Sequence, residues 1–143
     1  MGVINQLREL REFGGKPRTT GLDDASIERM AANDSLLGQA IADAVARHRE
    51  LRADMADFLK LDEAKQIAQV QAGFVNFYPD DAISPYLPAA ARGPWIVTLK
   101  GAVVHDNGGY GMLGFGHNDP KILAALSQPQ VMANVMAPSV AQL

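Results

Sequence analysis

The feature that most constrains how this chain can fold is an apolar stripe at helical spacing across residues 37–59. Its members recur every three or four positions: Leu37, Ile41, Ala44, Val45, His48, Leu51, Met55, Phe58 and Leu59. This spacing predicts one long helix with a single apolar face. Two uses of that face are open, packing within the chain and binding of a partner. We favour packing, because an amphipathic helix gains most of its stability from burying its stripe.

Shorter helices are expected around the long one, because residues before about 73 are rich in helix-forming and helix-capping types. One helix spans residues 3–13 and ends at the two glycines that follow it. Capping side chains mark where three more helices begin: Asp23 or Asp24, Asn33 or Asp34, and Asp62. The helix that begins at Asp62 should reach about residue 72.

The composition changes near residue 73, beyond which most of the glycines and prolines lie. Residues 74–79 look extended, since a residue that precedes proline avoids the helical region. The prolines within residues 85–94 predict an irregular segment there. Residues 95–99 and 102–105 have the composition of two strands, with Trp95 as a core anchor, and residues 106–109 have turn chemistry. Asn118 or Asp119 can cap a final helix that has Pro120 in its first turn.

Together these signals predict an α+β fold that is mainly α, a helical N-terminal half followed by a short β-hairpin and a further helix. A lone hairpin is only marginally stable in water, so it should pack on the helices or on another chain. We expect two parts, residues 1–73 as a helical N-terminal extension and residues 74–143 as a second segment, packed together as one unit. The apolar stretch at residues 131–136 would favour association if it were exposed.

Length, charge and cysteine content exclude several classes of protein. The 143 residues are enough for one domain with a core of its own. A net charge of −3 gives no electrostatic case for a nucleic acid or for an anionic membrane. The absence of cysteine rules out disulfides and thiol nucleophiles. There is no signal peptide and no apolar run of roughly 18 residues, so we expect a cytoplasmic protein.

A glycine pattern, Gly109-Tyr110-Gly111-Met112-Leu113-Gly114, satisfies the G-x-G-x-x-G spacing of dinucleotide-binding turns. That mechanism needs a helix that starts inside the motif and an acidic residue about 20 positions later. Here Gly116 and Pro120 would fall in the first turns of such a helix, and Asn134 stands where the acid should be. We therefore interpret the pattern as a tight, closely packed backbone at the end of a strand.

The remaining polar groups offer no strong catalytic constellation. His48, His105 and His117 are not at the spacing of metal ligands, and His48 falls on the helix stripe. A triple of Ser84, His105 and Asp106 has no nucleophile-elbow signature to support it. We expect the neighbouring acid pairs to be helix caps and solvated turns. These pairs are Asp23-Asp24, Asp62-Glu63 and Asp80-Asp81.

An ordered series of weak motifs runs from about Trp95 to Pro138. It consists of Gly101, the strand at residues 102–105, Asp106, the glycines between residues 108 and 114, Gly116-His117-Asn118-Asp119-Pro120 and the helix Ile122-Leu123-Ala124-Ala125-Leu126. In this order the series resembles the N-terminal region of class III pyridoxal-phosphate aminotransferases, the group of ornithine, acetylornithine and lysine-ε-aminotransferases. The resemblance covers about a third of the chain and makes residues 74–143 the aminotransferase-like segment of a fold-type-I enzyme.

The resemblance implies a substrate pocket and a dimer. In the family, the region that corresponds to residues 110–116 lies near the mouth of the active site and the subunit interface. Tyr110, Gly111, Met112 and Leu113 would then help to shape a substrate pocket, either in the same subunit or in its neighbour. The chain departs from the family in one local respect, a shorter interval between Asp106 and His117.

The same resemblance implies that this chain is a fragment. Family members are roughly three times longer and hold the cofactor as a Schiff base on a lysine far downstream. A carboxylate on the pyridine nitrogen and a phosphate-binding loop also lie downstream. The lysines present have no such context, namely Lys16, Lys60, Lys65, Lys100 and Lys121. Transamination needs the lysine and the carboxylate, so the chain alone should be inactive and bind no cofactor.

Two functions from different classes therefore remain. The first is a portion of a transferase that moves an amino group from an amino acid or ω-amine to a 2-oxo acid, with pyridoxal phosphate as the cofactor of the complete enzyme. Its partners would be a second copy or the remainder of the aminotransferase. The second is a non-catalytic helical module for binding or oligomerisation. A small enzyme of unrelated chemistry has only the glycine-rich run in its favour.

Overall fold

The computed structural model describes residues 2–73, 86–107 and 114–127, and all statements about the fold refer to these ranges. Five helices and three strands follow one another: α1 (Val3–Arg11), α2 (Asp24–Asn33), α3 (Ser35–Lys60), α4 (Glu63–Gln71), β1 (Pro88–Arg92), β2 (Trp95–Thr98), β3 (Val103–His105) and α5 (Pro120–Leu126). The expectation of a mainly helical α+β fold is confirmed.

Side-chain caps begin three of the helices where the sequence predicted them. Asp23 accepts a hydrogen bond from the Ser26 amide, and Asp34 accepts one from the Leu36 amide, both at 2.9 Å. Asp119 caps α5 through the Lys121 amide at 2.8 Å. These carboxylates satisfy amides that have no partner within the helix, so the boundaries are set locally.

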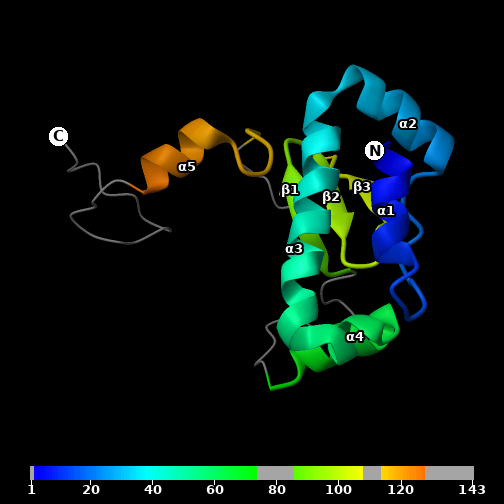
Figure 1. The fold of residues 1–143 in the computed structure, drawn as a ribbon. Helices are drawn as coiled ribbons and strands as arrows, with labels where there is room; N and C mark the ends of the chain where they lie inside the picture. The colour runs from blue at the N-terminus through cyan, green and yellow to red at the C-terminus, as the bar shows by residue number, and fades with distance from the viewer. Residues whose placement is uncertain (1, 74–85, 108–113, 128–143) are drawn as a thin grey trace.

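The helix α3 lies along one face of the sheet, with α1 beside it, and the two share one apolar core with the strands (Figure 1). The core residues come from α1, α2, α3, β2 and β3: Leu7, Leu10, Ile27, Leu37, Ala40, Ile41, Ala44, Val45, Trp95, Val97 and Val103. The predicted stripe of α3 is therefore buried within the chain over most of its length.

The buried stripe of α3 is interrupted at Met55, which is 42% exposed although its spacing predicts a buried side chain. Its backbone is not helical, with φ of −131° and ψ of 29°, and α3 is kinked there. The kink breaks the regular rotation of side chains around the helix, so spacing stops predicting which residues face the core. Leu59, beyond the kink, is buried again.

The sheet is antiparallel with the strand order β1-β2-β3. The prediction of only two strands was wrong, because β1 is a third. The predicted hairpin is present as β2 and β3, but residues 88–92 form a third strand where an irregular segment was expected. Pro88 opens this edge strand, a position that tolerates proline because no central hydrogen-bond ladder is interrupted. Arg92 ties β1 to α3 through a 2.6 Å contact with Asp43.

Trp95 is buried at the start of β2, as expected of a core anchor. Its indole nitrogen donates to Asp34 at 2.6 Å, so the carboxylate that caps α3 also fixes the sheet to that helix. Buried indole groups are stabilised when the N–H finds an acceptor. The cap and the anchor therefore set the position of α3 on the sheet together.

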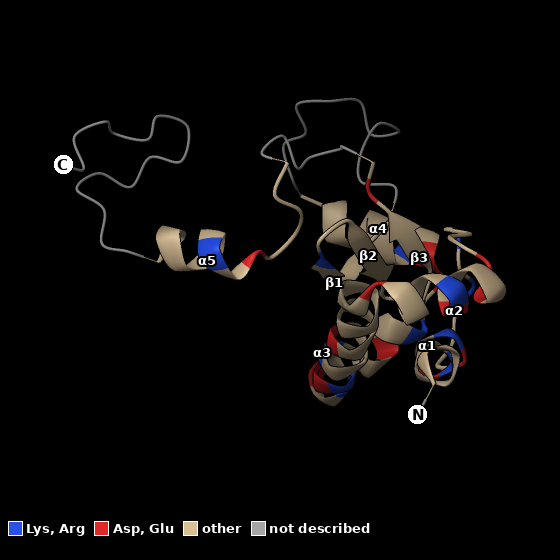
Figure 2. Ribbon diagram, turned by 90° about the horizontal axis from the view of Figure 1, so that it is seen from above, with Lys and Arg blue, Asp and Glu red and all other residues tan. Residues whose placement is uncertain are grey.

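The helix α5 extends away from the body formed by α1–α4 and the sheet (Figures 1 and 2). None of its residues is buried, and Leu123 and Leu126 are among the large exposed apolar side chains. Within the described ranges, no helix combines the length and the apolar character needed to cross a membrane. The segment expected to be extended at residues 74–79 and the apolar stretch at residues 131–136 lie outside the described residues.

Candidate functional site

The residues that the sequence predicts for a substrate pocket, Tyr110, Gly111, Met112 and Leu113, lie outside the described part of the chain. Residues on both sides of them are described, and together they line a groove of about 490 Å³. We call it the His117 groove. It is lined by Leu36, Gly93, Pro94, Asp106, Asn107, Gly114, Phe115, Gly116 and His117. Its walls thus come from the start of α3, the turn between β1 and β2, and both ends of the glycine-rich segment.

A pair of backbone hydrogen bonds closes one side of the groove. The His117 amide donates to the Gly93 carbonyl at 2.7 Å, and the Gly93 amide donates back to the His117 carbonyl at 2.9 Å. A Cβ on Gly116 would lie 2.7 Å from the Gly93 Cα, closer than real Cβ atoms come to other heavy atoms. Glycine at position 116 is therefore required for this close approach.

The side chains of Asp106 and His117 meet inside the groove, with His117 Nε2 at 2.9 Å from Asp106 Oδ2. Both are largely shielded from solvent, and the Asp106 amide is tied to the Pro94 carbonyl at 2.7 Å. Asn118 adds a bond from its side-chain amide to the Ala91 carbonyl at 2.8 Å. The two ends of the glycine-rich segment are thus fastened to the same β1–β2 turn.

The sequence did not predict this pair, because eleven positions and a run of glycines separate the two residues. The triple that the sequence offered joined Asp106 to His105 and Ser84 instead. The His105 ring lies edge-on to the Trp95 ring, with the ring centroids 4.7 Å apart. The Nδ1 atom of His105 lies 2.5 Å from Oδ1 of Asn107. Ser84 lies outside the described residues, so the triple is not assembled within them.

The described lining of the groove combines apolar side chains with one imidazole–carboxylate pair and contains no nucleophile. A carboxylate that accepts from one imidazole nitrogen fixes the orientation and the tautomer of the ring. Leu36, Pro94 and Phe115 supply apolar contact, and Phe115 is 61% exposed. No serine, threonine, cysteine or lysine is among the lining residues.

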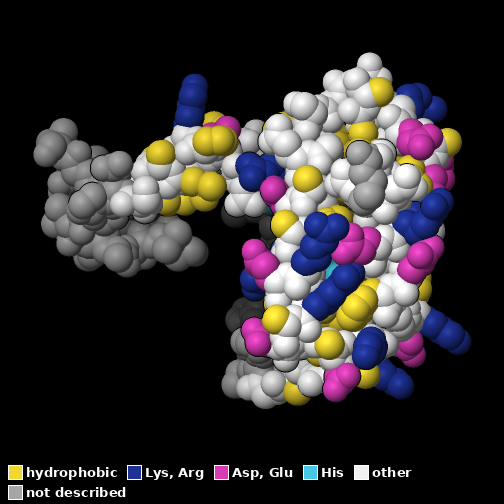
Figure 3. All heavy atoms as spheres, viewed as in Figure 1, with side chains coloured by type: hydrophobic (Ala, Val, Ile, Leu, Met, Phe, Trp, Pro, Cys, Tyr) yellow, Lys and Arg dark blue, Asp and Glu magenta, His cyan; other side chains and the backbone are white. Residues whose placement is uncertain are grey.

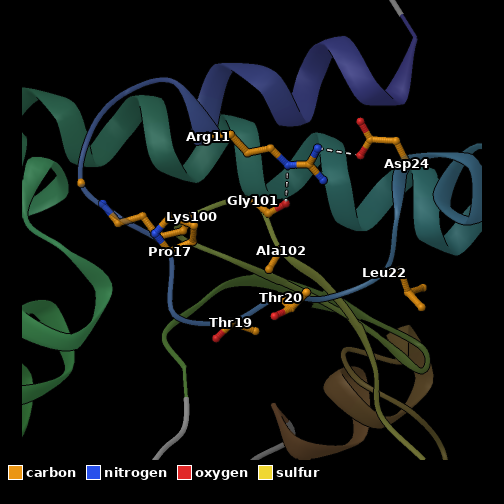
Figure 4. Close-up of a pocket in the computed structure, with 10 residues that line it drawn as sticks. Arg11, Pro17, Thr19, Thr20, Leu22, Asp24, Lys100, Gly101 and Ala102 are labelled. Atoms are coloured by element: carbon orange, nitrogen blue, oxygen red, sulfur yellow. Dashed lines mark hydrogen bonds and ion pairs between the residues drawn. The ribbon is translucent and has the colours of Figure 1, made fainter.

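A second cavity, of about 300 Å³, lies between residues 15–22 and the turn at residues 100–102 (Figure 4). Arg11 lines it, but its guanidinium already donates to the Gly101 carbonyl at 3.1 Å and to Asp24 at 2.7 Å. The Lys100 side chain extends along the wall beside Pro17, away from Arg11. Its ammonium donates to the carbonyls of Gly14 and Leu59, each at 2.7 Å. Both cations therefore already have hydrogen-bond acceptors within the chain, which indicates a structural role.

Burial lowers the pKa of Lys100, and the nearby carboxylates of Glu63 and Asp62 act in the opposite direction. The side chain is only 4% exposed. An amine that donates to two carbonyls and is covered in this way is not accessible to a dissolved aldehyde. Lys100 consequently holds the ends of α1 and α3 together.

Glu63 is a correction to the expectation that the acid pair with Asp62 lies in a solvated turn. Its carboxylate is fully buried and accepts from the amides of Arg18 and Thr19, at 2.5 and 2.7 Å, and from the Thr19 hydroxyl at 3.0 Å. Asp62 accepts from the Lys16 amide at 2.8 Å, a bond that lowers the pKa of Asp62. The pair fixes the loop after α1 onto α4.

Across the described residues there is no group of three His, Asp or Glu side chains that could hold a metal ion. The chain matches no protein-family model, no curated protein and no solved structure.

Proposed function

We propose that this chain is the N-terminal portion of a class III pyridoxal-phosphate-dependent aminotransferase. The support is the ordered series of motifs from Gly101 to Leu126, together with one geometric observation. Two residues of that series, Asp106 and His117, meet at 2.9 Å and line a groove at the ends of the glycine-rich segment. In the proposed enzyme this groove borders the substrate pocket.

The groove contributes shape and orientation to the proposed reaction. The apolar walls formed by Leu36 and Phe115 suit the carbon chain of an amino acid or ω-amine, and residues 110–113 would complete the pocket. The ring of His117, oriented by Asp106, can hold a proton at its Nε2 atom. The complete enzyme would transfer the amino group to a 2-oxo acid.

The residues of this chain do not fit the cofactor by themselves. Pyridoxal phosphate supplies an electron sink once a lysine holds it, but none of the five lysines lines the His117 groove. Lys100 is buried against two carbonyls, and the other four are exposed on the surface. We therefore assign the Schiff-base lysine and the carboxylate on the pyridine nitrogen to parts of the enzyme outside this chain.

The test is to express the whole reading frame that contains this chain, and the chain alone, and to assay both for amino transfer with pyridoxal phosphate. The whole product should show cofactor absorbance and transfer between an amine and a 2-oxo acid, whereas the chain alone should show neither. A whole product that binds the cofactor poorly and transfers no amino group from any amino acid or ω-amine would contradict the proposal.

The second function, a non-catalytic module for binding or oligomerisation, is favoured by a different observation. Phe115, Leu123 and Leu126 are large apolar side chains exposed on or near α5, a helix with no buried residue. Size-exclusion chromatography with light scattering tests it directly. A mass that rises with protein concentration supports association, and a monomer mass that stays constant over a hundredfold range of concentration counts against it.

A further inference from the structure

A histidine lies buried where α3 passes the end of α1, outside both cavities described above. His48 is 1% exposed, and its Nδ1 atom lies 3.2 Å from Nε of Arg52, one helical turn further on. A guanidinium group can only donate hydrogen bonds. His48 Nδ1 must therefore be the acceptor, so it carries no proton and the ring is neutral in this arrangement.

The same arginine connects His48 to α1. Its guanidinium lies over the ring of Phe13, 4.4 Å from the centroid, and donates to the Glu9 backbone carbonyl at 3.3 Å. The Phe13 ring in turn packs against His48 with centroids 5.1 Å apart. The Glu9 carboxylate accepts from Arg49 at 2.6 and 2.9 Å and lies 3.1 Å from Arg52. We call these five residues the α1–α3 clasp.

On the face of the molecule shown in Figure 3, cationic and anionic side chains lie next to one another over α3 and α1. Three charged groups face His48 from three elements: Glu9 from α1, Arg52 from α3 and Lys100 from the turn after β2. Burial and the two cations lower the pKa of His48, and only Glu9 opposes them. The surroundings thus disfavour a proton on the ring.

We propose that the α1–α3 clasp is an acid-sensitive latch in which His48 is the trigger. A proton taken from solvent by Nδ1 removes the only acceptor that Arg52 Nε has in the clasp and places two cations side by side. The Arg52 side chain must then leave the Phe13 ring or break its bond to Glu9. Since Leu7 and Leu10 stay buried in the core, opening is confined to the last turn of α1 and to Phe13.

The latch can be tested on the full chain by NMR, with the His48 ring and the amides of Glu12 and Phe13 as reporters. These amides donate to the Arg8 and Leu10 carbonyls at 2.9 and 3.4 Å. The wild-type ring should titrate below its ordinary pKa of 6.5. Over the same range, amide opening should rise by up to about tenfold per pH unit, after correction for intrinsic exchange.

Two variants separate the latch from general acid denaturation. His48→Gln keeps an oxygen that can accept from Arg52 but cannot take up a proton, so opening of the Phe13 amide should be independent of pH down to the range in which Glu9 takes up its proton. Arg52→Gln removes the donor and one cation, so the His48 pKa should rise toward its ordinary value.

The proposal is overturned if the wild-type His48 ring titrates at or above 6.5, or if His48→Gln opens with acid as the wild type does. If His48→Gln fails to fold, Arg52→Gln still decides, because an unchanged His48 pKa in that variant removes the basis of the latch.

Discussion

Asp106 and His117 lie at the two ends of the glycine-rich segment, eleven positions apart in the sequence. Oδ2 of Asp106 and Nε2 of His117 are 2.9 Å apart. Each is also tied by its backbone amide to the β1–β2 turn, Asp106 to Pro94 and His117 to Gly93. The pair therefore does more than join two side chains, since it fixes both ends of the segment that the resemblance places at a substrate pocket.

Replacing Asp106 by Asn should weaken the hydrogen bond between this side chain and His117. The variant loses the charged acceptor of a partly buried hydrogen bond, and we expect the free energy of unfolding to fall by about 1 kcal/mol. Urea unfolding followed by circular dichroism measures the change. Asp57→Asn is the matched control, because Asp57 is fully exposed and its 3.9 Å ion pair with Lys60 lies on the surface, so the free energy of unfolding should not change. Equal effects of the two substitutions would show that the pair does not contribute.

Alanine substitutions at two glycines test the close approach of the backbone at Gly116 to the backbone at Gly93. Gly116 and Gly114 both have positive φ, +74° and +67°, but only the Cβ of residue 116 would meet Gly93, at 2.7 Å. Gly114→Ala should lose about 1 kcal/mol from backbone strain alone. Gly116→Ala should lose a further 1–3 kcal/mol, roughly, from overpacking and from disruption of the bonds to Gly93. Similar stabilities of the two variants would contradict the close approach.

Glu63→Gln should release the loop after α1. The buried carboxylate holds two amides and a hydroxyl, and hydrogen bonds to a charged group contribute about 1.5–3 kcal/mol. Limited trypsin digestion gives a local readout, because the bond after Arg18 lies within the loop. Cleavage there should become faster in Glu63→Gln than in the wild type. An unchanged cleavage rate together with an unchanged unfolding midpoint would exclude the role assigned to Glu63.

Acid should reduce the stability of the fold through Glu9 and Asp62. The Arg49 hydrogen bonds lower the pKa of Glu9 below 4.5, and the Lys16 amide lowers the pKa of Asp62 below 3.8. The folded chain thus binds these protons less readily than the unfolded chain does, so the stabilisation is complete above those values and is lost as the pH falls through them. Urea midpoints between about pH 6 and pH 3 measure the loss. Glu9→Gln should flatten the curve, and a curve as steep as that of the wild type would rule Glu9 out.

The helices could be predicted from the sequence because their signals are local. Asp23, Asp34 and Asp119 cap the helices that their positions predict, and the stripe of α3 is buried except at the kink near Met55. The strand β1 could not be predicted, because its Ala-rich residues become a strand only by pairing with β2 beneath α3.

The candidate site was predictable only in part. Its residues belong to motifs that the sequence shows, yet the approach of Gly116 to Gly93 and the meeting of His117 with Asp106 depend on the fold. The burial of Glu63 was not predictable for the same reason, since nothing in its neighbours along the chain indicates a buried carboxylate. Contacts between distant segments carry no local signal, whereas caps and stripes do.

We propose that this chain is part of an aminotransferase whose Schiff-base lysine lies outside residues 1–143. The most direct test is to treat the product of the whole reading frame with pyridoxal phosphate, reduce it with borohydride and map the modified lysine by mass spectrometry. We predict stoichiometric labelling of one lysine beyond this chain and none at Lys16, Lys60, Lys65, Lys100 or Lys121. Stoichiometric labelling of any of those five lysines, or the absence of a labelled lysine anywhere in the product, would contradict the account.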